Sequence, residues 1–195
     1  MGDWITLFDG TTLNGWKATG NPEGWIVEDG CIKCLALKGG YLATDAQFEN
    51  FVLELQYKTE ADVNSGIFFR WSDLADPVHT GLEIQILDTF AKETLGKQDS
   101  GALYDLIPPS TNAAKPAGEW TDFRLECNGP MIHLDQNGKR ILDVDIGVFD
   151  TPGKSPDGTD NKFKYAWKDM PRRGHIGLQD HNGVIWFRNL RIREL

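Results

Sequence analysis

Three β-type segments of this sequence carry polar side chains that could transfer protons or bind oxygen-rich ligands. Alternate side chains of a strand point to opposite faces of its sheet. In the segment 81–88, this period places the aliphatic residues on one face and places Glu83 and Gln85 on the other. A carboxyl group beside an amide can exchange a proton and hydrogen-bond hydroxyl groups. We therefore expect this face to line a binding site.

Two other segments show the same pattern. In the segment 64–71, alternation places Arg70 opposite the aliphatic side, and in the segment 174–181 it places Gln179 and His181 there. Glycines between these residues would leave room for a ligand to approach the backbone. A solvated sheet face would also be polar, but such faces usually favour Lys, Glu and Thr. The residue types here favour a binding surface.

The rest of the sequence predicts the elements that must position these groups. The chain has 195 residues, of which 21 are glycine and 9 are proline, and short apolar runs alternate with turn signals throughout. This rhythm predicts a single all-β domain over residues 1–195, folded as a sandwich of two antiparallel sheets. The segments expected to be strands are 25–27, 31–35, 41–43, 51–58, 65–71, 82–87, 122–127, 131–134, 140–144, 175–179 and 184–192.

Turn residues and two long connections complete this picture. Asn128-Gly129, Asn137-Gly138 and Asn182-Gly183 supply the positive φ angles that tight hairpins need. The connections 88–119 and 147–173 are long for a compact domain, which favours loops that build or cover a site, although they could simply seal a sheet edge. Within the first of them, residues 90–97 have a weak helical pattern.

Charge and apolar content exclude several classes of function. The formal net charge is −9, from 20 Lys and Arg against 29 Asp and Glu, which opposes binding to nucleic acid. No segment approaches the roughly 18 apolar residues of a membrane span, and the first residues do not resemble a signal peptide. The chain is therefore expected neither to span a membrane nor to bind nucleic acid.

The three cysteines are expected to be buried thiols. Cys31 and Cys34 lie three residues apart on one predicted strand, so their side chains face opposite ways and are poorly placed for a disulfide or a shared metal. Cys127 lies far away in the sequence.

The polar motifs belong to a larger ordered set. These short motifs are Leu7-Phe8-Asp9-Gly10, Leu13-Asn14-Gly15-Trp16, Asn64-Ser65-Gly66 leading to Arg70, Gly81-Leu82-Glu83-Ile84-Gln85-Ile86-Leu87-Asp88, Gly101-Ala102-Leu103-Tyr104-Asp105, Gly118-Glu119-Trp120, Gly177-Leu178-Gln179-Asp180-His181 and Phe187-Arg188-Asn189. In this order they resemble the 3-keto-disaccharide hydrolase family over essentially the whole chain. The resemblance implies a concanavalin A-like jelly-roll sandwich and an enzyme that acts on a small carbohydrate, a 3-keto-glycoside. It also implies a bacterial protein that works in the periplasm or outside the cell.

The resemblance gives the polar residues roles in one reaction. A ketone at C3 of a sugar acidifies the hydrogen on C2, so that a base can remove it while the leaving group departs from C1, and water can then add. We expect His181 to be the general base and Arg70 to stabilise the enolate. Glu83 is expected to be the acid or to orient Arg70. Residues expected to bind substrate are Gln85, Gln179, Tyr104 and, from the loop end, Asp180.

The same residues are compatible with other chemistry and other functions. No cofactor is expected, although Glu83 and His181 with a further carboxylate could hold a divalent metal. A conventional glycosidase would need two carboxyl groups about 5 to 5.5 Å apart if it retains configuration, and the predicted face offers one. A non-catalytic carbohydrate-binding module would use the same fold and groove. A protein-docking domain would instead need a large apolar patch. The oligomeric state is not indicated.

Overall fold

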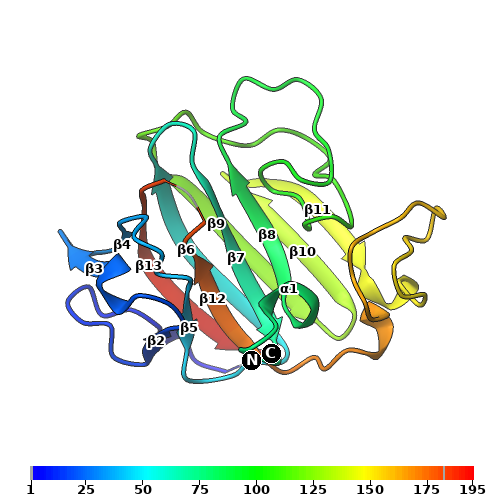
Figure 1. Ribbon diagram of the computed structural model, residues 1–195, viewed down its shortest axis with the longest axis horizontal. Helices are drawn as coiled ribbons and strands as arrows, with labels where there is room; N and C mark the ends of the chain where they lie inside the picture. The colour runs from blue at the N-terminus through cyan, green and yellow to red at the C-terminus, as the bar shows by residue number, and fades with distance from the viewer. Residues whose placement is uncertain (1, 182) are drawn as a thin grey trace.

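Two antiparallel sheets pack face to face in the computed structural model, which describes residues 2–181 and 183–195 (Figure 1). The larger sheet has the order β11-β10-β9-β6-β13-β4-β3, with β1 paired to β13. Its strands are β1 (Ile5–Thr6), β3 (Trp25–Glu28), β4 (Cys31–Cys34), β6 (Phe51–Thr59), β9 (Thr121–Asn128), β10 (Met131–Gln136), β11 (Lys139–Asp145) and β13 (Ile185–Glu194). The predicted all-β sandwich is confirmed.

The smaller sheet has the order β2-β5-β12-β7-β8. Its strands are β2 (Trp16–Ala18), β5 (Tyr41–Thr44), β7 (Asn64–Trp71), β8 (Leu82–Leu87) and β12 (His175–Gln179). The helical elements are one short helix, α1 (Pro77–Thr80), and the 3-10 turns η1 (Pro22–Gly24), η2 (Ile146–Val148) and η3 (Trp167–Asp169). No helix among the described residues is long and apolar enough to cross a membrane.

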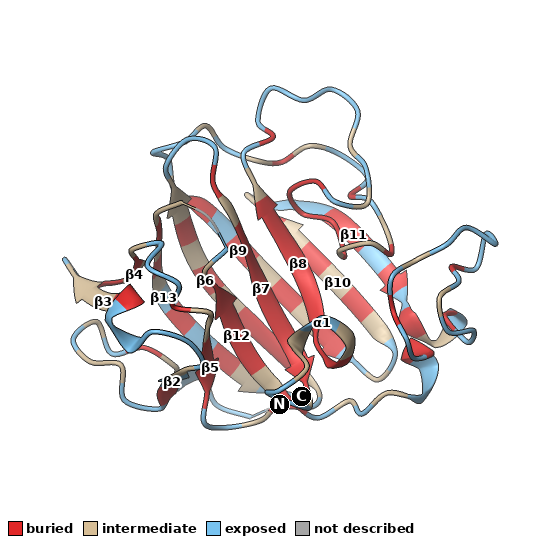
Figure 2. Ribbon diagram, viewed as in Figure 1, coloured by how far each residue is buried: buried red, intermediate tan, exposed pale blue. Residues whose placement is uncertain are grey.

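Alternation along the strands builds the core between the sheets. In β6, Leu53 and Leu55 are buried, whereas Glu54 and Gln56 lie on the outer side. In β8, Leu82, Ile84 and Ile86 are at most 1% exposed and join the same core. Figure 2 shows the resulting distribution, with buried residues concentrated on the central strands and exposed residues on the loops.

Most strands lie within two residues of their predicted bounds, and β8 and β12 match them. Strands β1 and β2 were not predicted, because each is too short to show a period. The predicted helical pattern at residues 90–97 is wrong: this segment consists of turns and bends. The hairpin turns at Asn128-Gly129 and Asn137-Gly138 are confirmed, with Gly129 at φ +54° and Gly138 at φ +76°. The turn at Asn182-Gly183 includes a residue outside the described ones.

A β-bulge interrupts the alternation of β7 near its end. His175 pairs with Trp71 and Gly177 pairs with Phe68, so two residues of β7 oppose one residue of β12. Arg70, within the bulge, has φ +50°. The extra residue moves Trp71 to the outer face, where its ring joins Phe68 and Tyr41.

The long connections both extend from the sandwich as loops (Figure 1). Residues 101–104 of the first loop run along β8: Gly101 N donates to the Gln85 carbonyl, and Tyr104 N donates to the Glu83 carbonyl, at 2.8 and 2.9 Å. This pairing extends the smaller sheet beyond β8 and brings Tyr104 beside the polar face.

The cysteines are buried and unpaired, as expected. Burial raises the pKa of Cys34 and of Cys127 to about 12 in each case, so both remain neutral thiols near neutral pH.

Candidate functional site

A hollow of about 180 Å³ lies on the outer face of the smaller sheet. Strands β5, β7, β8 and β12 form its floor, and the two long loops supply its walls. Its lining residues are Tyr41, Asn64, Phe68, Val78, Glu83, Gln85, Tyr104, Lys162, Gln179 and His181. Five of the seven residues proposed from the sequence therefore meet at one place.

Strand register explains why these residues meet. Gln85 of β8 is paired with Gly66 of β7, and Glu83 is paired with Phe68. On the other side of the hollow, Gln179 of β12 is paired with Tyr41 of β5. Side chains at paired positions lie on the same face of a sheet, so the polar residues of separate strands form one surface.

Glu83 is the central acidic group of the hollow. Glu83 is 8% exposed. Its carboxyl group lies over Gly66, so a Cβ atom added to Gly66 would overlap it. Burial disfavours the charged carboxylate and raises the pKa of Glu83 from 4.5 to about 7, although the nearby Lys162 ammonium acts in the opposite direction. Glu83 can therefore give or take a proton near neutral pH.

Lys162 supplies a positive charge to the same hollow. Its ammonium nitrogen lies 4.0 Å from the centroid of the Tyr104 ring, a cation–π contact. Its backbone N–H donates to Asp105 Oδ2 at 2.7 Å, which fastens the loop 147–173 beside the loop that carries Tyr104. Desolvation lowers the pKa of Lys162, whereas the carboxylates of Glu83 and Asp105 act to raise it.

Amide groups complete the floor of the hollow. Gln85 Nε2 donates to Asn64 Oδ1 at 3.1 Å, which holds both amides in place. Gln179 is 8% exposed, and its Oε1 atom is buried without a hydrogen-bond partner among the described residues. A buried acceptor of this kind is suited to a hydroxyl donor from a ligand.

Arg70 lies outside this site, contrary to the prediction from alternation. It is 2% exposed, and the bulge directs its guanidinium to the end of the sandwich. There, Nε donates to the Glu49 carbonyl at 3.1 Å, Nη1 donates to the Gly129 carbonyl at 2.8 Å and Nη2 donates to Asn50 Oδ1 at 3.3 Å. Arg70 thus ties together segments that end the two sheets. It is not available to stabilise an enolate in the hollow.

Asp180 is also placed elsewhere. Its Oδ2 atom accepts a hydrogen bond from Gly39 N at 2.6 Å, so the carboxylate fixes the turn that precedes β5. Asp180 is not among the residues that line the hollow, and its predicted role as a loop-end substrate ligand stays a prediction. It follows Gln179 in the chain and points to the opposite side.

The expected space above the glycines is filled by the protein itself. The Glu83 carboxyl group lies over Gly66, and a Cβ on Gly177 would lie 3.1 Å from ring carbons of Trp71. These glycines therefore make room for side chains of the floor, and a ligand would contact those side chains rather than the backbone.

The histidines separate into one site residue and three others. His181 lines the hollow and is exposed at its rim. His175 has its Nδ1 atom 2.6 Å from the Thr44 carbonyl and its Nε2 atom 2.9 Å from Gln47 Nε2. His79 lies on α1, and His133 faces Asp143 at 3.2 Å on the larger sheet.

Three other polar lining residues, Tyr41, Asn64 and Lys162, were not predicted as site residues from the sequence. Alternation places Tyr41 and Asn64 on outer faces, but which strands lie beside each other depends on topology, which the pattern does not reveal. Lys162 comes from a loop without a period. Its one signal was the length of the connection 147–173, which favoured a role in building a site.

No group of three or more His, Cys, Asp or Glu side chains suited to a metal lies within residues 2–181 and 183–195. The Lys162 ammonium also occupies the surroundings of Glu83, where it would repel a cation. Activity without a metal stays a prediction, which turnover after chelation would test.

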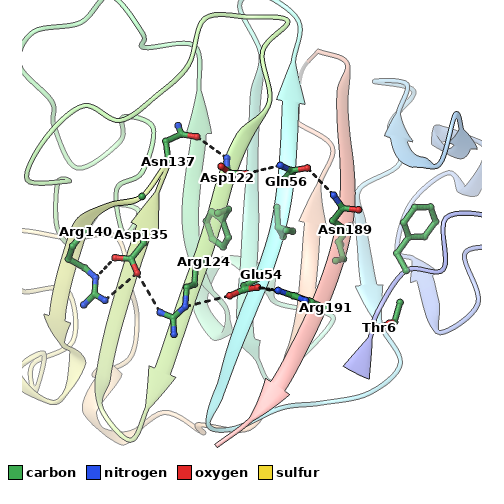
Figure 3. Close-up of a pocket in the computed structure, with 15 residues that line it drawn as sticks. Thr6, Glu54, Gln56, Asp122, Arg124, Asp135, Asn137, Arg140, Asn189 and Arg191 are labelled. Carbon is green, nitrogen blue, oxygen red and sulfur yellow. Dashed lines mark hydrogen bonds and ion pairs between the residues drawn. The ribbon is translucent and has the colours of Figure 1, made fainter. Parts of the chain in front are cut away.

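A larger hollow of about 910 Å³ lies on the outer face of the larger sheet (Figure 3). Its charged groups pair with one another: Arg191 Nη2 lies 2.6 Å from Glu54 Oε2, and Arg124 bridges Glu54 and Asp135 at 3.6 and 3.5 Å. These charged groups are already paired across neighbouring strands, whereas the Glu83 carboxyl group is buried in the smaller hollow. The chemistry favours the smaller hollow around Glu83.

The fold agrees with comparisons to known proteins. A structure from Parabacteroides distasonis ATCC 8503, provisionally named a glycosyl hydrolase, superimposes with a TM-score of 0.89 at 32% identity and covers 99% of this chain and 100% of that one. A β-glucanase of Bacillus licheniformis has a TM-score of 0.57 at 9% identity over 100% of this chain and 98% of that one, and it supports the jelly-roll fold alone.

Sequence comparison identifies the family. A 3-keto-disaccharide hydrolase of Bacteroides thetaiotaomicron is 32% identical over 228 residues, which cover 98% of this chain and 78% of that protein. The family model described as "3-keto-alpha-glucoside-1,2-lyase-like domain" matches residues 3–193. The chain therefore belongs to the family of 3-keto-alpha-glucoside-1,2-lyase-like domains.

Proposed function

We propose that this protein cleaves 3-keto-glycosides by elimination followed by hydration. A base takes the C2 proton, and the electrons of that bond form an enolate with the C3 ketone. The enolate expels the C1 oxygen, which leaves with the bonding pair and takes a proton. Water then adds to C1 and a proton returns to C2. In sum, one 3-keto-glycoside and one water give one free 3-keto sugar and one alcohol, with no change of oxidation state.

Three side chains of the hollow fit the three needs of this reaction. His181 at the rim is the base for the C2 proton. The Lys162 ammonium stabilises the enolate oxygen, the role expected of Arg70, which does not line the hollow. Glu83, whose pKa is raised to about 7, protonates the departing oxygen. Gln85, Gln179 and Tyr104 hold sugar hydroxyls.

The buried carboxyl of Glu83 beside the Lys162 charge is the observation that carries this proposal. A carboxyl with an ordinary pKa would be ionised at neutral pH and would be a poor acid. The position of Glu83 on the floor of the hollow keeps a fraction of it protonated where a leaving oxygen could lie.

Two leaving groups separate the roles of Glu83 and His181. Methanol leaves with difficulty and needs an acid, whereas p-nitrophenol leaves readily without one. We expect Glu83→Gln to lower turnover of methyl 3-keto-glucoside by about 10²-fold or more and to affect the p-nitrophenyl compound much less. His181→Ala should lower turnover of both. Unchanged turnover in both variants would remove these residues from the mechanism.

The same assays test the rival function of a carbohydrate-binding module. A module would bind intact glycan and release no product from any of these compounds, whereas the enzyme turns over the oxidised sugar.

A further inference from the structure

A second hollow of about 510 Å³ adjoins the one around Glu83. The two share Asn64, Gln85 and Tyr104 in their walls, so they meet at these three residues. The Asn64–Gln85 amide pair lies at the boundary, with Tyr104 beside it. A substrate with two units would place one on each side of this boundary.

Resting on the proposed function, we infer that this second hollow is the leaving-group subsite and that it accepts a polyhydroxylated unit, a second sugar, through Gln98. His181, Lys162 and Glu83 are not among its lining residues, so its contribution is to the choice of leaving group.

The far wall of the second hollow is held in shape by buried charge. The side chain of Asp99 is 8% exposed, and its carboxylate contacts the Lys92 ammonium at 2.7 Å and the Gly96 N–H at 2.5 Å. On the same loop, Lys97 Nζ donates to Thr159 Oγ1 at 2.9 Å and thereby joins the two long connections. The loop segment that forms this wall is therefore held by the contacts of both Asp99 and Lys97.

The lining of this hollow is polar, and it favours hydroxyl groups over an apolar leaving group. Its residues are Asn64, Gln85, Leu87, Lys92, Gly96, Lys97, Gln98, Asp99, Tyr104 and Asp105. Gln98 is exposed at the opening, where its Nε2 atom lies 3.4 Å from Asp105 Oδ1. This long contact leaves the amide free to exchange its partner for a hydroxyl. Leu87 is the one aliphatic residue that lines the hollow.

The test compares leaving groups of similar size on one 3-keto-glucosyl unit. Wild-type protein should cleave a 3-keto-disaccharide with a kcat/KM at least about 10-fold above that for the cyclohexyl 3-keto-glucoside, whose ring lacks hydroxyls. Gln98→Trp, which fills the opening, should lower the ratio of these two constants by about 10-fold or more. Glu93→Trp on the same loop, outside this hollow, should leave the ratio at the wild-type value. An equal ratio in Gln98→Trp and wild type would overturn the subsite.

A binding measurement keeps this test separate from the proposed reaction. Glucose is titrated into the Glu83→Gln protein and into Glu83→Gln combined with Gln98→Trp, and binding is followed by NMR. We expect the second substitution to weaken glucose binding at least about fivefold. Equal glucose binding in the two proteins would contradict the subsite even if turnover is normal. Absence of turnover in wild type, with glucose binding still dependent on Gln98, would contradict the reaction and retain the subsite.

Discussion

Glu83 and Lys162 both act in the proposed reaction, and each shifts the pKa of the other. Glu83 must be protonated to release the leaving oxygen, so turnover should decline as the pH rises through about 7, the pKa of this buried carboxyl. The Lys162 ammonium lowers the pKa of Glu83 by favouring the carboxylate. The two functions of Lys162, stabilising the enolate and setting this pKa, can therefore be separated by pH.

Lys162→Met removes both functions. We expect turnover of methyl 3-keto-glucoside to fall by about 10²-fold, because one donor to a developing oxyanion is lost. The alkaline decline in turnover should also move to higher pH, because the pKa of Glu83 rises when the positive charge is gone. Lys162→Arg should keep the decline near its wild-type position.

Lys168→Met, a change of the same kind on the same loop, is the control for Lys162→Met and should leave the pH profile unaltered. A Lys162→Met profile with the wild-type alkaline midpoint would show that this ammonium does not act on Glu83.

At the scale of the strand, one bulge decides which polar residues reach the site. Strands β8 and β12 are regular, so alternation correctly placed Glu83, Gln85 and Gln179 on the outer face. Strand β7 has an extra residue at the bulge near Arg70, so side chains no longer alternate between the two faces as predicted from that point. Bulge position depends on pairing with the neighbouring strand, so the sequence of β7 alone does not reveal it.

Arg70 is accordingly expected to matter for stability. Arg70→Met removes the buried donor of two backbone carbonyls, and Asn50 Oδ1 keeps only its hydrogen bond from Gly129 N. This loss should lower the free energy of unfolding by about 2 to 4 kcal/mol. Chemical denaturation measures this loss, and the turnover of the protein that remains folded should stay near the wild-type value. If Arg70→Met kept wild-type stability but lost turnover, Arg70 would have a role in the reaction instead.

For the fold as a whole, burial of the Glu83 carboxyl group lowers the free energy of unfolding at neutral and higher pH. The folded protein raises the pKa of Glu83 from 4.5 to about 7, so between these values the native state binds more protons than the unfolded chain. The contribution of Glu83 to stability is therefore lost as the pH rises from about 4.5 through 7. One pKa unit corresponds to about 1.4 kcal/mol, so above about pH 7 the ionisation of Glu83 lowers the free energy of unfolding by on the order of 3 kcal/mol.

Glu83→Gln removes this titration. Its free energy of unfolding relative to wild type should increase by roughly 2 to 3 kcal/mol when the pH is raised from about 5 to about 8. Urea denaturation at the two pH values measures the difference. Glu93→Gln, at an exposed loop position, should follow wild type at both. A constant difference between Glu83→Gln and wild type would mean that Glu83 is not perturbed.

The sandwich could be predicted from sequence because alternation and turn residues are local signals. The site could be predicted only in part, because it also depends on contacts between distant segments. Lys162 reaches the hollow through a hydrogen bond between its backbone and Asp105, 57 positions away in the chain. Neither long loop has a periodic pattern that would reveal this contact.

The origin of the hydrogen at C2 of the product distinguishes elimination and hydration from direct hydrolysis. The proposed reaction removes that hydrogen and restores one from solvent, whereas direct hydrolysis at C1 leaves it in place. Cleavage of methyl 3-keto-glucoside in ²H₂O, followed by NMR at early times, should give a product with deuterium at C2, faster than the free 3-keto sugar exchanges by itself. A product formed enzymatically with its original hydrogen at C2 would contradict elimination and hydration in this protein.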